Sequence, residues 1–221
     1  MNARPIVAEL VGSGLLAYVV VGSGITVAHF GADGASGLFF HAVAVGLALA
    51  VLIAILGSTS GAHFNPAVTV AFWRRRKLDA GRAVGYFVAQ VVGATAGVAV
   101  AVATFGDTLA LSTTERNGWG PVLAEGIGTL VLVLVIFGLI DDERPHAVAP
   151  FVGAWVAAAV FATVSTGFLN PALTLARTFT DTYTGIAPTS VPGFVLAQLI
   201  GGLLAALVSA RLLVPSQQKG A

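Results

Sequence analysis

The stretch SGAHFNPAVTVAF, residues Ser60–Phe72, returns later in the chain as STGFLNPALTLAR, residues Ser165–Arg177. Each copy centres on an Asn-Pro-Ala triplet flanked by Gly, Ser and Thr. The Asn fits a helix N-cap, the Pro fits the first helical position, and the small Ala permits close packing. The triplets therefore predict the start of one short helix in each copy: Asn65, Pro66, Ala67, Asn170, Pro171 and Ala172.

The chain around these triplets has the composition of a membrane protein. Of its 221 residues 57% are hydrophobic and 10% are charged, against roughly 25% charged residues in a soluble domain. Apolar stretches long enough to cross a lipid bilayer as helices are found at 6–28, 38–57, 83–104, 121–140, 147–164 and 191–213. We therefore predict an all-α polytopic membrane protein with six transmembrane helices.

Two further segments, 58–73 and 165–179, are too short to span a bilayer, and they carry the two triplets. Non-helical backbone at membrane depth is tolerated only where protein or a water-filled cavity surrounds it. These segments therefore predict re-entrant half-helices at 65–73 and 170–179.

Charge and cysteine content exclude several classes of function. A net charge of +1 gives no support for nucleic-acid binding. The absence of cysteine excludes disulfides and thiolate metal sites. No nucleophile, metal cluster or cofactor motif emerges, so we expect neither an enzyme nor a bound metal or cofactor.

The basic residues are unevenly distributed between the predicted loops. Nine of the eleven fall on one side of the predicted membrane: Arg4, Arg74, Arg75, Arg76, Lys77, Arg82, Arg144, Arg211 and Lys219. The other side has Arg116 and Arg177, together with acidic residues such as Asp33. The positive-inside rule then predicts that both termini are cytoplasmic.

The two halves resemble each other beyond the triplets. Residues Val7–Val20 (VAELVGSGLLAYVV) are similar to Leu123–Ile136 (LAEGIGTLVLVLVI), and Val88–Ala94 (VAQVVGA) is similar to Leu196–Gly202 (LAQLIGG). Each half holds three spans, so the second half should be inverted relative to the first. We predict inverted repeats at 1–112 and 113–221, with a substrate path where they meet.

Two half-helices that begin near the bilayer centre would direct their positive dipole ends toward each other. The Asn side chains would then offer amide donors to a neutral oxygen ligand, while the dipoles repel cations. Water held by these donors cannot form a continuous proton wire, so this arrangement would pass neutral solutes without passing protons.

The motif SGAHFNPAVT and the six-plus-two organisation resemble the aquaporin and aquaglyceroporin (major intrinsic protein) family over nearly the whole chain. This resemblance implies a six-helix bundle with two re-entrant half-helices, assembled as a homotetramer with one pore per subunit. It also implies that Glu9 and Glu125 accept hydrogen bonds from the re-entrant loops, and that His63 lines the cytoplasmic half of the path.

The residues alone leave a second interpretation of the two glutamates. An ionisable residue inside a membrane span is costly and usually functional, so Glu9 or Glu125 could titrate in a proton-coupled secondary transporter. Their symmetric placement favours a scaffold instead. Gln90 and Gln198 are expected to be interhelical hydrogen-bond partners, and His41, near a span end, is expected to be interfacial.

The chain departs from the family at the narrowest part of the pore. Water-selective members and most glycerol channels have arginine directly after the second triplet, where this chain has Leu173. The corresponding positions in the second span and the second loop are Val45 and Gly167. The fifth-span position falls between Ala158 and Phe161, and we assign it to Phe161. This filter is predicted to be uncharged, apolar and wide.

The next arginine after the second triplet is Arg177, about 10 Å farther along the helix than Asn170 at 1.5 Å per residue. It could form a displaced positive ring at the outer mouth, near Asp181. Alternatively, it could extend to interfacial water and cap the half-helix.

The sequence NPALTLARTFTDTYTGIAP, residues 170–188, also looks like a bacterial subgroup associated with arsenic-resistance operons that lacks the filter arginine. This resemblance implies a channel in the inner (plasma) membrane that passes small uncharged solutes: arsenous acid, As(OH)₃, and related metalloid acids, glycerol-like polyols, and water. The alternative within the family is a water-selective channel.

Overall fold

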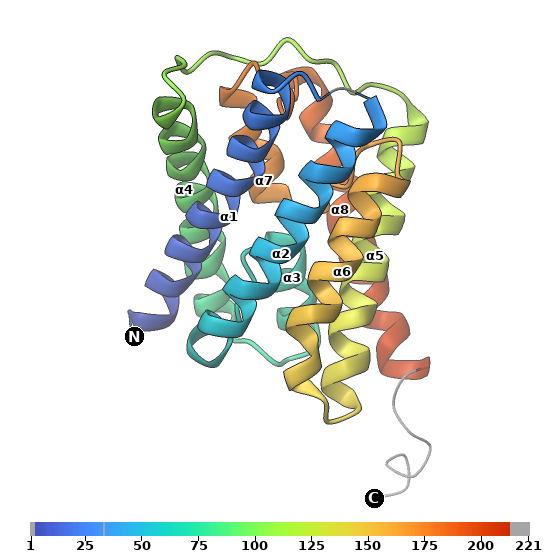
Figure 1. Ribbon diagram of the computed structural model, residues 1–221. Helices are drawn as coiled ribbons and strands as arrows, with labels where there is room; N and C mark the ends of the chain where they lie inside the picture. Colours follow the sequence, from blue (N-terminus) through green and yellow to red (C-terminus); the bar gives the residue numbers. More distant parts are fainter. Residues whose placement is uncertain (1–2, 33, 213–221) are drawn as a thin grey trace, which may run out of the picture.

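The computed structural model describes residues 3–32 and 34–212, and all its regular secondary structure is helical (Figure 1). The α-helices are α1 Arg4–His29, α2 Gly34–Ser60, α3 Pro66–Arg74, α4 Ala80–Thr104, α5 Trp119–Asp141, α6 Val148–Ala162, α7 Pro171–Ala176 and α8 Val191–Leu212. Short 3₁₀ helices are η1 Pro145–Ala147, η2 Arg177–Phe179 and η3 Pro188–Ser190.

Six helices in the described residues are long and apolar enough to cross a membrane. They lie where the sequence predicts spans, with small differences at the ends: the second runs over Gly34–Ser60, and the fifth ends at Ala162. The predicted all-α class with six spans is therefore confirmed. Asp33, Lys219 and position 213 of the last predicted span lie outside the described residues.

The two Asn-Pro-Ala triplets start helices that are too short to span. Asn65 accepts a hydrogen bond from the backbone N–H of Ala67 at 2.9 Å, and Asn170 accepts one from Ala172 at 3.0 Å. Each Asn is thus an N-cap with proline at the first helical position. Figure 1 shows α3 and α7 in opposite halves of the bundle.

The spans pack in matching pairs, α1 against α4 and α5 against α8. Glycine permits both crossings: a Cβ on Gly97 would lie 2.0 Å from the carbonyl oxygen of Gly14, and one on Gly201 would lie 2.2 Å from that of Gly126. The half-helices pack across the halves, α3 against α8 and α7 against α4. The middle of the bundle is therefore built from both halves.

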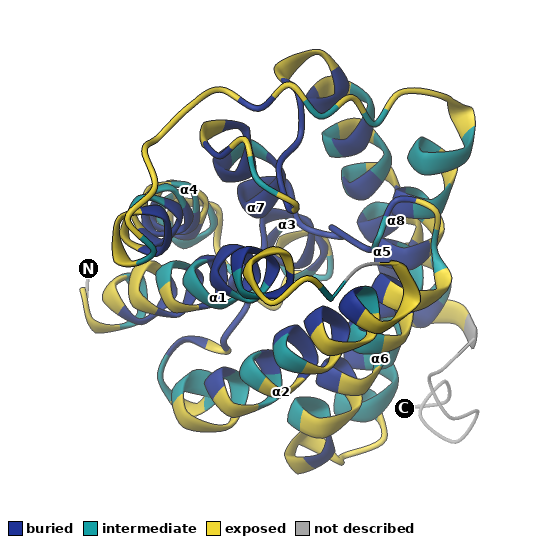
Figure 2. Ribbon diagram, turned by 45° about the horizontal axis from the view of Figure 1, so that its top comes forward, coloured by how far each residue is buried: buried dark blue, intermediate teal, exposed yellow. Residues whose placement is uncertain are grey.

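The outside of the bundle is apolar. Large hydrophobic side chains such as Leu47 and Ile55 are exposed at 64% and 61%, and Figure 2 shows exposed residues along the outer faces of the long helices. A lipid bilayer is the solvent that such a surface requires. The start of α1 and the end of α8 lie at the same end of the molecule, whereas the connection after α4 crosses the opposite end (Figure 1).

Candidate functional site

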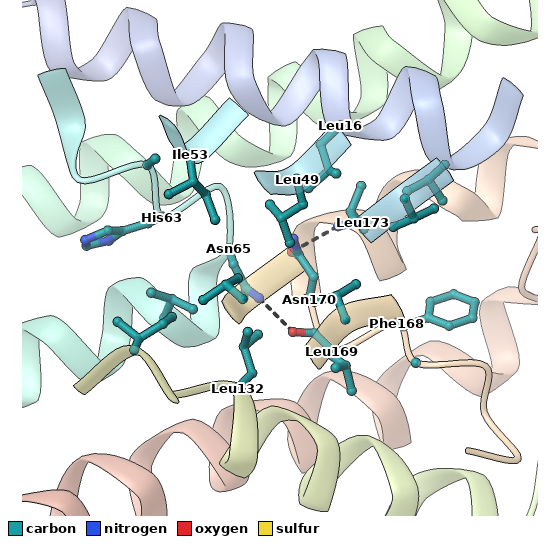
Figure 3. A pocket seen from close by; sticks show the side chains of 18 of the residues that line it. Leu16, Leu49, Ile53, His63, Asn65, Leu132, Phe168, Leu169, Asn170 and Leu173 are labelled. Atoms are coloured by element: carbon teal, nitrogen blue, oxygen red, sulfur yellow. Dashed lines mark hydrogen bonds between the residues drawn. The ribbon is translucent and has the colours of Figure 1, made fainter. Parts of the chain in front are cut away.

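A cavity of about 840 Å³, including its open ends, runs between the two half-helices (Figure 3). Most of its wall consists of apolar side chains that recur every four residues, so that one stripe of each helix faces inward. The longest stripes include Val45, Leu49 and Ile53 on α2 and Val152, Val156 and Val160 on α6.

The two capping asparagines meet at the middle of this cavity. The Asn65 side-chain amide donates to the carbonyl oxygen of Leu169 at 2.7 Å, and the Asn170 amide donates to that of Phe64 at 2.8 Å. Each triplet is thus tied to the loop that precedes the other. Both asparagines line the cavity, and each amide nitrogen has a second hydrogen that it can offer to a solute.

The loop before each half-helix contains a non-glycine residue with a positive φ, which the sequence does not predict. Phe64 has φ 48° and Leu169 has φ 49°, a left-handed region that non-glycine residues rarely adopt. Such a residue costs about 1 kcal/mol or more unless its surroundings hold it in place. No glycine marks these two positions, so sequence reasoning had no signal for them.

Glu9 holds the first loop in this conformation. It is fully buried, and it accepts hydrogen bonds from the backbone N–H groups of His63 at 2.9 Å and Phe64 at 2.7 Å. The side chains of Ser60 and Gln90 donate to the same carboxylate at 2.6 and 2.7 Å. Four donors therefore converge on one buried group.

Glu125 does the same for the second loop. It accepts from the backbone N–H groups of Phe168 at 2.9 Å and Leu169 at 2.6 Å, and from the Gln198 side chain at 2.7 Å. Gln90 and Gln198 also bond Thr69 and Thr174, at 2.9 Å each. Among the described residues neither glutamate lines the cavity.

His63 lies on the α3 side of the cavity wall and is 7% exposed. Its Nδ1 is 3.1 Å from the hydroxyl of Thr69, and its ring packs against Phe72 and Tyr86 at centroid distances of 4.3 and 5.4 Å. The ring is therefore fixed by contacts on several sides.

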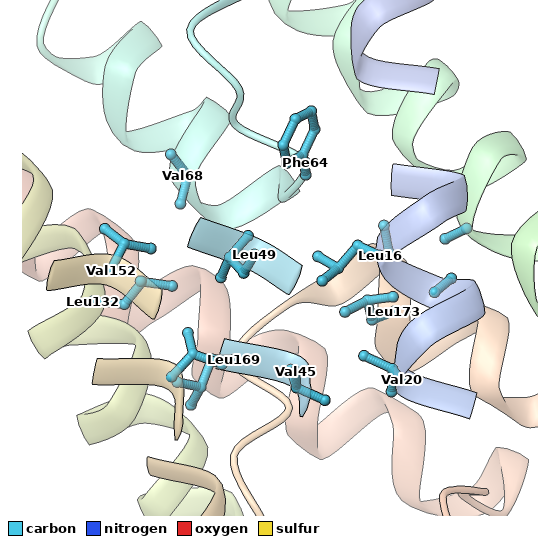
Figure 4. Packing of buried hydrophobic residues seen from close by; sticks show 14 of the residues in the cluster. Leu16, Val20, Val45, Leu49, Phe64, Val68, Leu132, Val152, Leu169 and Leu173 are labelled. Carbon is cyan, nitrogen blue, oxygen red and sulfur yellow. The ribbon is translucent and has the colours of Figure 1, made fainter. Parts of the chain in front are cut away.

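Three of the four expected filter residues line the other half of the cavity: Val45, Gly167 and Leu173. Gly167 has φ 58°, and a Cβ there would lie 2.7 Å from the backbone nitrogen of Val160. This close approach places Val160 of α6 beside the loop. Figure 4 shows Val45 and Leu173 in the same cluster of buried side chains.

The choice of Phe161 as the fifth-span filter residue is corrected by this geometry. Phe161 is 50% exposed and packs on Phe39 at a ring-centroid distance of 6.2 Å. The inward stripe of α6 runs through Val156 and Val160, and the next residue points about 100° away from it. Val160, inside the window that the sequence left open, is the residue that lines the cavity.

Arg177 lines the cavity and is 4% exposed, so it does not extend to interfacial water. Its guanidinium carbon lies 3.4 Å from the centroid of the Phe168 ring, and its Nε donates to the carbonyl of Thr184. No described ion pair joins it to Asp181, whose carboxylate accepts from Thr113 instead. Arg177 thus belongs to the cavity wall.

Arg116 packs on the same Phe168 ring at 5.0 Å, without lining the cavity. It donates to the carbonyls of Gly185 at 2.9 Å and Tyr183 at 3.3 Å, which holds the loop between η2 and η3 in place. Burial lowers the pKa of both guanidinium groups, and the charge of Arg116 lowers that of Arg177 further, whereas the charge of Glu125 raises both.

His41 was expected at the interface, but it is buried in the cavity wall. Its ring is 3% exposed, and its Nδ1 lies 2.8 Å from the hydroxyl of Ser23. The signal that could have found it is its spacing: it lies four residues before Val45, on the same face of α2.

Comparison with known proteins agrees with this architecture. The sequence profile of the major intrinsic protein family matches residues 1–160. The chain is 43% identical to the aquaglyceroporin AqpS of Rhizobium meliloti, over 97% of this chain and 92% of that protein. It is 34% identical to the probable aquaporin AqpM of Archaeoglobus fulgidus, over 92% and 94% of the two chains.

The fold also matches a solved structure. The aquaglyceroporin from Plasmodium falciparum superposes with a TM-score of 0.75 over the full length of both chains, at 22% sequence identity. This likeness shows the aquaporin-like fold. Together with the matching family profile, it establishes that the chain is a multi-pass membrane channel of the major intrinsic protein family and not an enzyme.

Proposed function

We propose that this channel passes small uncharged solutes: arsenous acid and related metalloid acids, glycerol-like polyols, and water. One observation carries the proposal. The four cavity-lining residues that stand at the filter positions are Val45, Val160, Gly167 and Leu173, and none of them is charged. A glycine and three aliphatic side chains leave more room than an aromatic residue and an arginine would.

The chemistry of the wall suits amphipathic solutes. A polyol or an undissociated oxyacid has hydroxyl groups that must keep hydrogen bonds, whereas the rest of its surface loses little on an apolar wall. The amides of Asn65 and Asn170 supply donors at the middle of the path. The 43% identical relative, which is named an aquaglyceroporin, supports a solute range that includes polyols.

Proton and ion exclusion follows from the two half-helix N-termini. Each carries the equivalent of about half a positive charge, and both Asn caps lie at the cavity wall. A water molecule that accepts hydrogen bonds from the two amides cannot also accept protons from its neighbours in the file. We therefore expect solute flux without proton or cation flux.

We interpret Glu9 and Glu125 as scaffolds for the two loops rather than as a proton relay. Each carboxylate accepts hydrogen bonds from backbone N–H groups of one loop, and neither carboxylate lines the cavity in the described part of the chain. The matching geometry of the two sites supports inverted repeats at 1–112 and 113–221, each of which supplies half of the pore.

The assembly and orientation of the channel are also part of the proposal. We infer a homotetramer in the inner (plasma) membrane with both termini in the cytoplasm. The basic run Arg74–Lys77 supports this orientation, because it lies at the end of α3 that faces away from the cavity centre. The family resemblance supports the tetramer.

Uptake into proteoliposomes tests the proposed substrates. We expect purified protein to accelerate entry of glycerol and As(OH)₃ well above the rate in protein-free vesicles, measured by light scattering for glycerol and by elemental analysis for arsenic. Entry of both solutes at the lipid background rate, with rapid water flow, would instead establish a water-selective channel.

The same vesicles test the proton-coupled alternative. With a pH gradient imposed, we expect the internal solute concentration to approach the external one and stop. Accumulation above the external concentration would contradict a passive channel and would implicate Glu9 or Glu125 as a titrating site.

A further inference from the structure

The charged part of the cavity wall lies one helical turn outside the apolar filter. Arg177 follows Leu173 by four residues at the end of α7, and His41 precedes Val45 by four residues on α2. Four residues of helix advance by about 6 Å and return to the same face. Because α7 runs outward from the centre and α2 runs inward, both steps lead toward the same mouth (Figure 1).

The ring of His41 is held so that one nitrogen remains available. In the tautomer in which the Ser23 hydroxyl donates to the carbonyl of Val20 at 3.2 Å, Nδ1 of His41 donates to that hydroxyl at 2.8 Å. A neutral ring then has Nε2 as an acceptor. No described residue bonds this Nε2, and His41 lines the cavity. Tyr183 packs edge-on against the ring at 6.0 Å.

The guanidinium of Arg177 is fixed in the complementary way. Stacking on Phe168 at 3.4 Å and the bond from Nε to Thr184 determine its position. No described residue accepts a hydrogen bond from its two terminal nitrogens, and no described carboxylate forms an ion pair with it. The group therefore presents free donors and positive charge to the cavity.

We propose that His41 and Arg177 form an outer polar ring that binds neutral hydroxyl-bearing solutes before they enter the apolar filter. The guanidinium donors match hydroxyl oxygens, and Nε2 of His41 accepts a hydroxyl hydrogen. The ring replaces part of the hydration that a polyol or an undissociated oxyacid loses on entry. Cations are repelled, because the guanidinium has no paired carboxylate.

This inference rests on the proposed function, because it explains how polar solutes reach an apolar constriction. It assigns solute selection to two residues outside the four filter positions. The ring should matter more for polyols than for water, since a polyol gives up several hydrogen bonds at once whereas a water molecule gives up few.

The test is stopped-flow glycerol and water permeability of proteoliposomes with Arg177→Met, His41→Leu and wild-type protein. Methionine keeps apolar contact with Phe168 while it removes the donors. We expect Arg177→Met to reduce glycerol permeability at least fivefold and His41→Leu at least twofold, with water permeability within twofold of wild type. The control Arg144→Met, at an exposed arginine paired with Asp142, should change neither rate.

Each outcome bears on the inference. Glycerol permeability within twofold of wild type in a folded Arg177→Met channel would overturn the ring, while leaving the proposed function intact. If Arg177→Met fails to fold, an unchanged glycerol rate in His41→Leu would overturn it. A wild-type channel without glycerol flux above the lipid background would overturn both the proposed function and the ring.

Discussion

The two re-entrant loops share one scaffold but differ in what they present to the cavity. In each, an asparagine caps a half-helix and donates to the other loop, and a buried glutamate accepts from two successive backbone N–H groups. The first loop adds His63, fixed by Thr69 and two aromatic rings. The second adds Gly167, Leu173 and Arg177. The scaffold thus appears twice, whereas only the second of the two loops contributes residues to the proposed filter and outer polar ring.

The scaffold should be the part most sensitive to substitution. Glu125→Leu leaves the N–H groups of Phe168 and Leu169 and the amide of Gln198 without their acceptor. At about 1–3 kcal/mol for each buried unsatisfied group, we expect a loss of at least ~3 kcal/mol. Fluorescence-detected size-exclusion after heating would measure it. Glu9→Leu is the matched variant. A loss of stability well below ~3 kcal/mol in either variant would contradict the equal scaffold roles of the two glutamates.

The N-caps should have the next largest effect. Asn170→Ala removes the cap on Ala172 and the bond to the carbonyl of Phe64. A lost cap costs about 1 kcal/mol and a lost buried hydrogen bond about as much, so we expect ~2 kcal/mol. Thermal unfolding in detergent would measure it. Asn65→Ala should cost about as much stability as Asn170→Ala. A large difference between the two losses would contradict the equivalence of the two half-helix caps.

The filter should respond in selectivity rather than in stability. Leu173→Arg introduces a charge into the apolar filter, to which Val45 also belongs. We expect glycerol permeability to fall about tenfold, which corresponds to ~1.4 kcal/mol in the barrier, with a smaller effect on water. Stopped-flow light scattering measures both rates. Phe161→Ala serves as the control, because Phe161 faces away from the cavity; an equal loss there would contradict the assignment of the wall.

The smallest effect is expected at the opposite mouth. Asp141 pairs with Arg75 and Lys77 at 3.0 Å each, and Arg75 stacks on Phe137. Because asparagine keeps one acceptor oxygen for the two cations at this partly buried site, we expect Asp141→Asn to cost about 1 kcal/mol and to leave glycerol permeability unchanged. The same thermal and flux assays would show it. A strong flux change would mean that this mouth of the cavity also selects solutes.

The fold could be predicted because its signals are periodic and repeated. Long apolar runs predict the six spans, and two Asn-Pro-Ala triplets predict the half-helices, since capping and proline preferences act locally. Glu9 and Glu125 could be placed at the loops through the family resemblance. The structure then identified the donors that each glutamate accepts from.

The cavity wall could be predicted only in part. Val45, Gly167 and Leu173 lie at fixed distances from a motif, but Phe161 was assigned across a segment of uncertain length, and a one-residue error turns a helical side chain by about 100°. His41 was assigned to the interface because it lies near a span end, although its position four residues before Val45 puts it on the same face of that helix. The positive φ values of Phe64 and Leu169 are imposed by Glu9 and Glu125 from distant helices.

The central claim is that an apolar, uncharged constriction admits polyols as well as water. The most direct test is to mix wild-type proteoliposomes with a glycerol gradient and follow vesicle volume. The claim predicts rapid shrinkage followed by protein-dependent reswelling as glycerol enters. Shrinkage without reswelling faster than that of protein-free vesicles would contradict it and establish a channel for water alone.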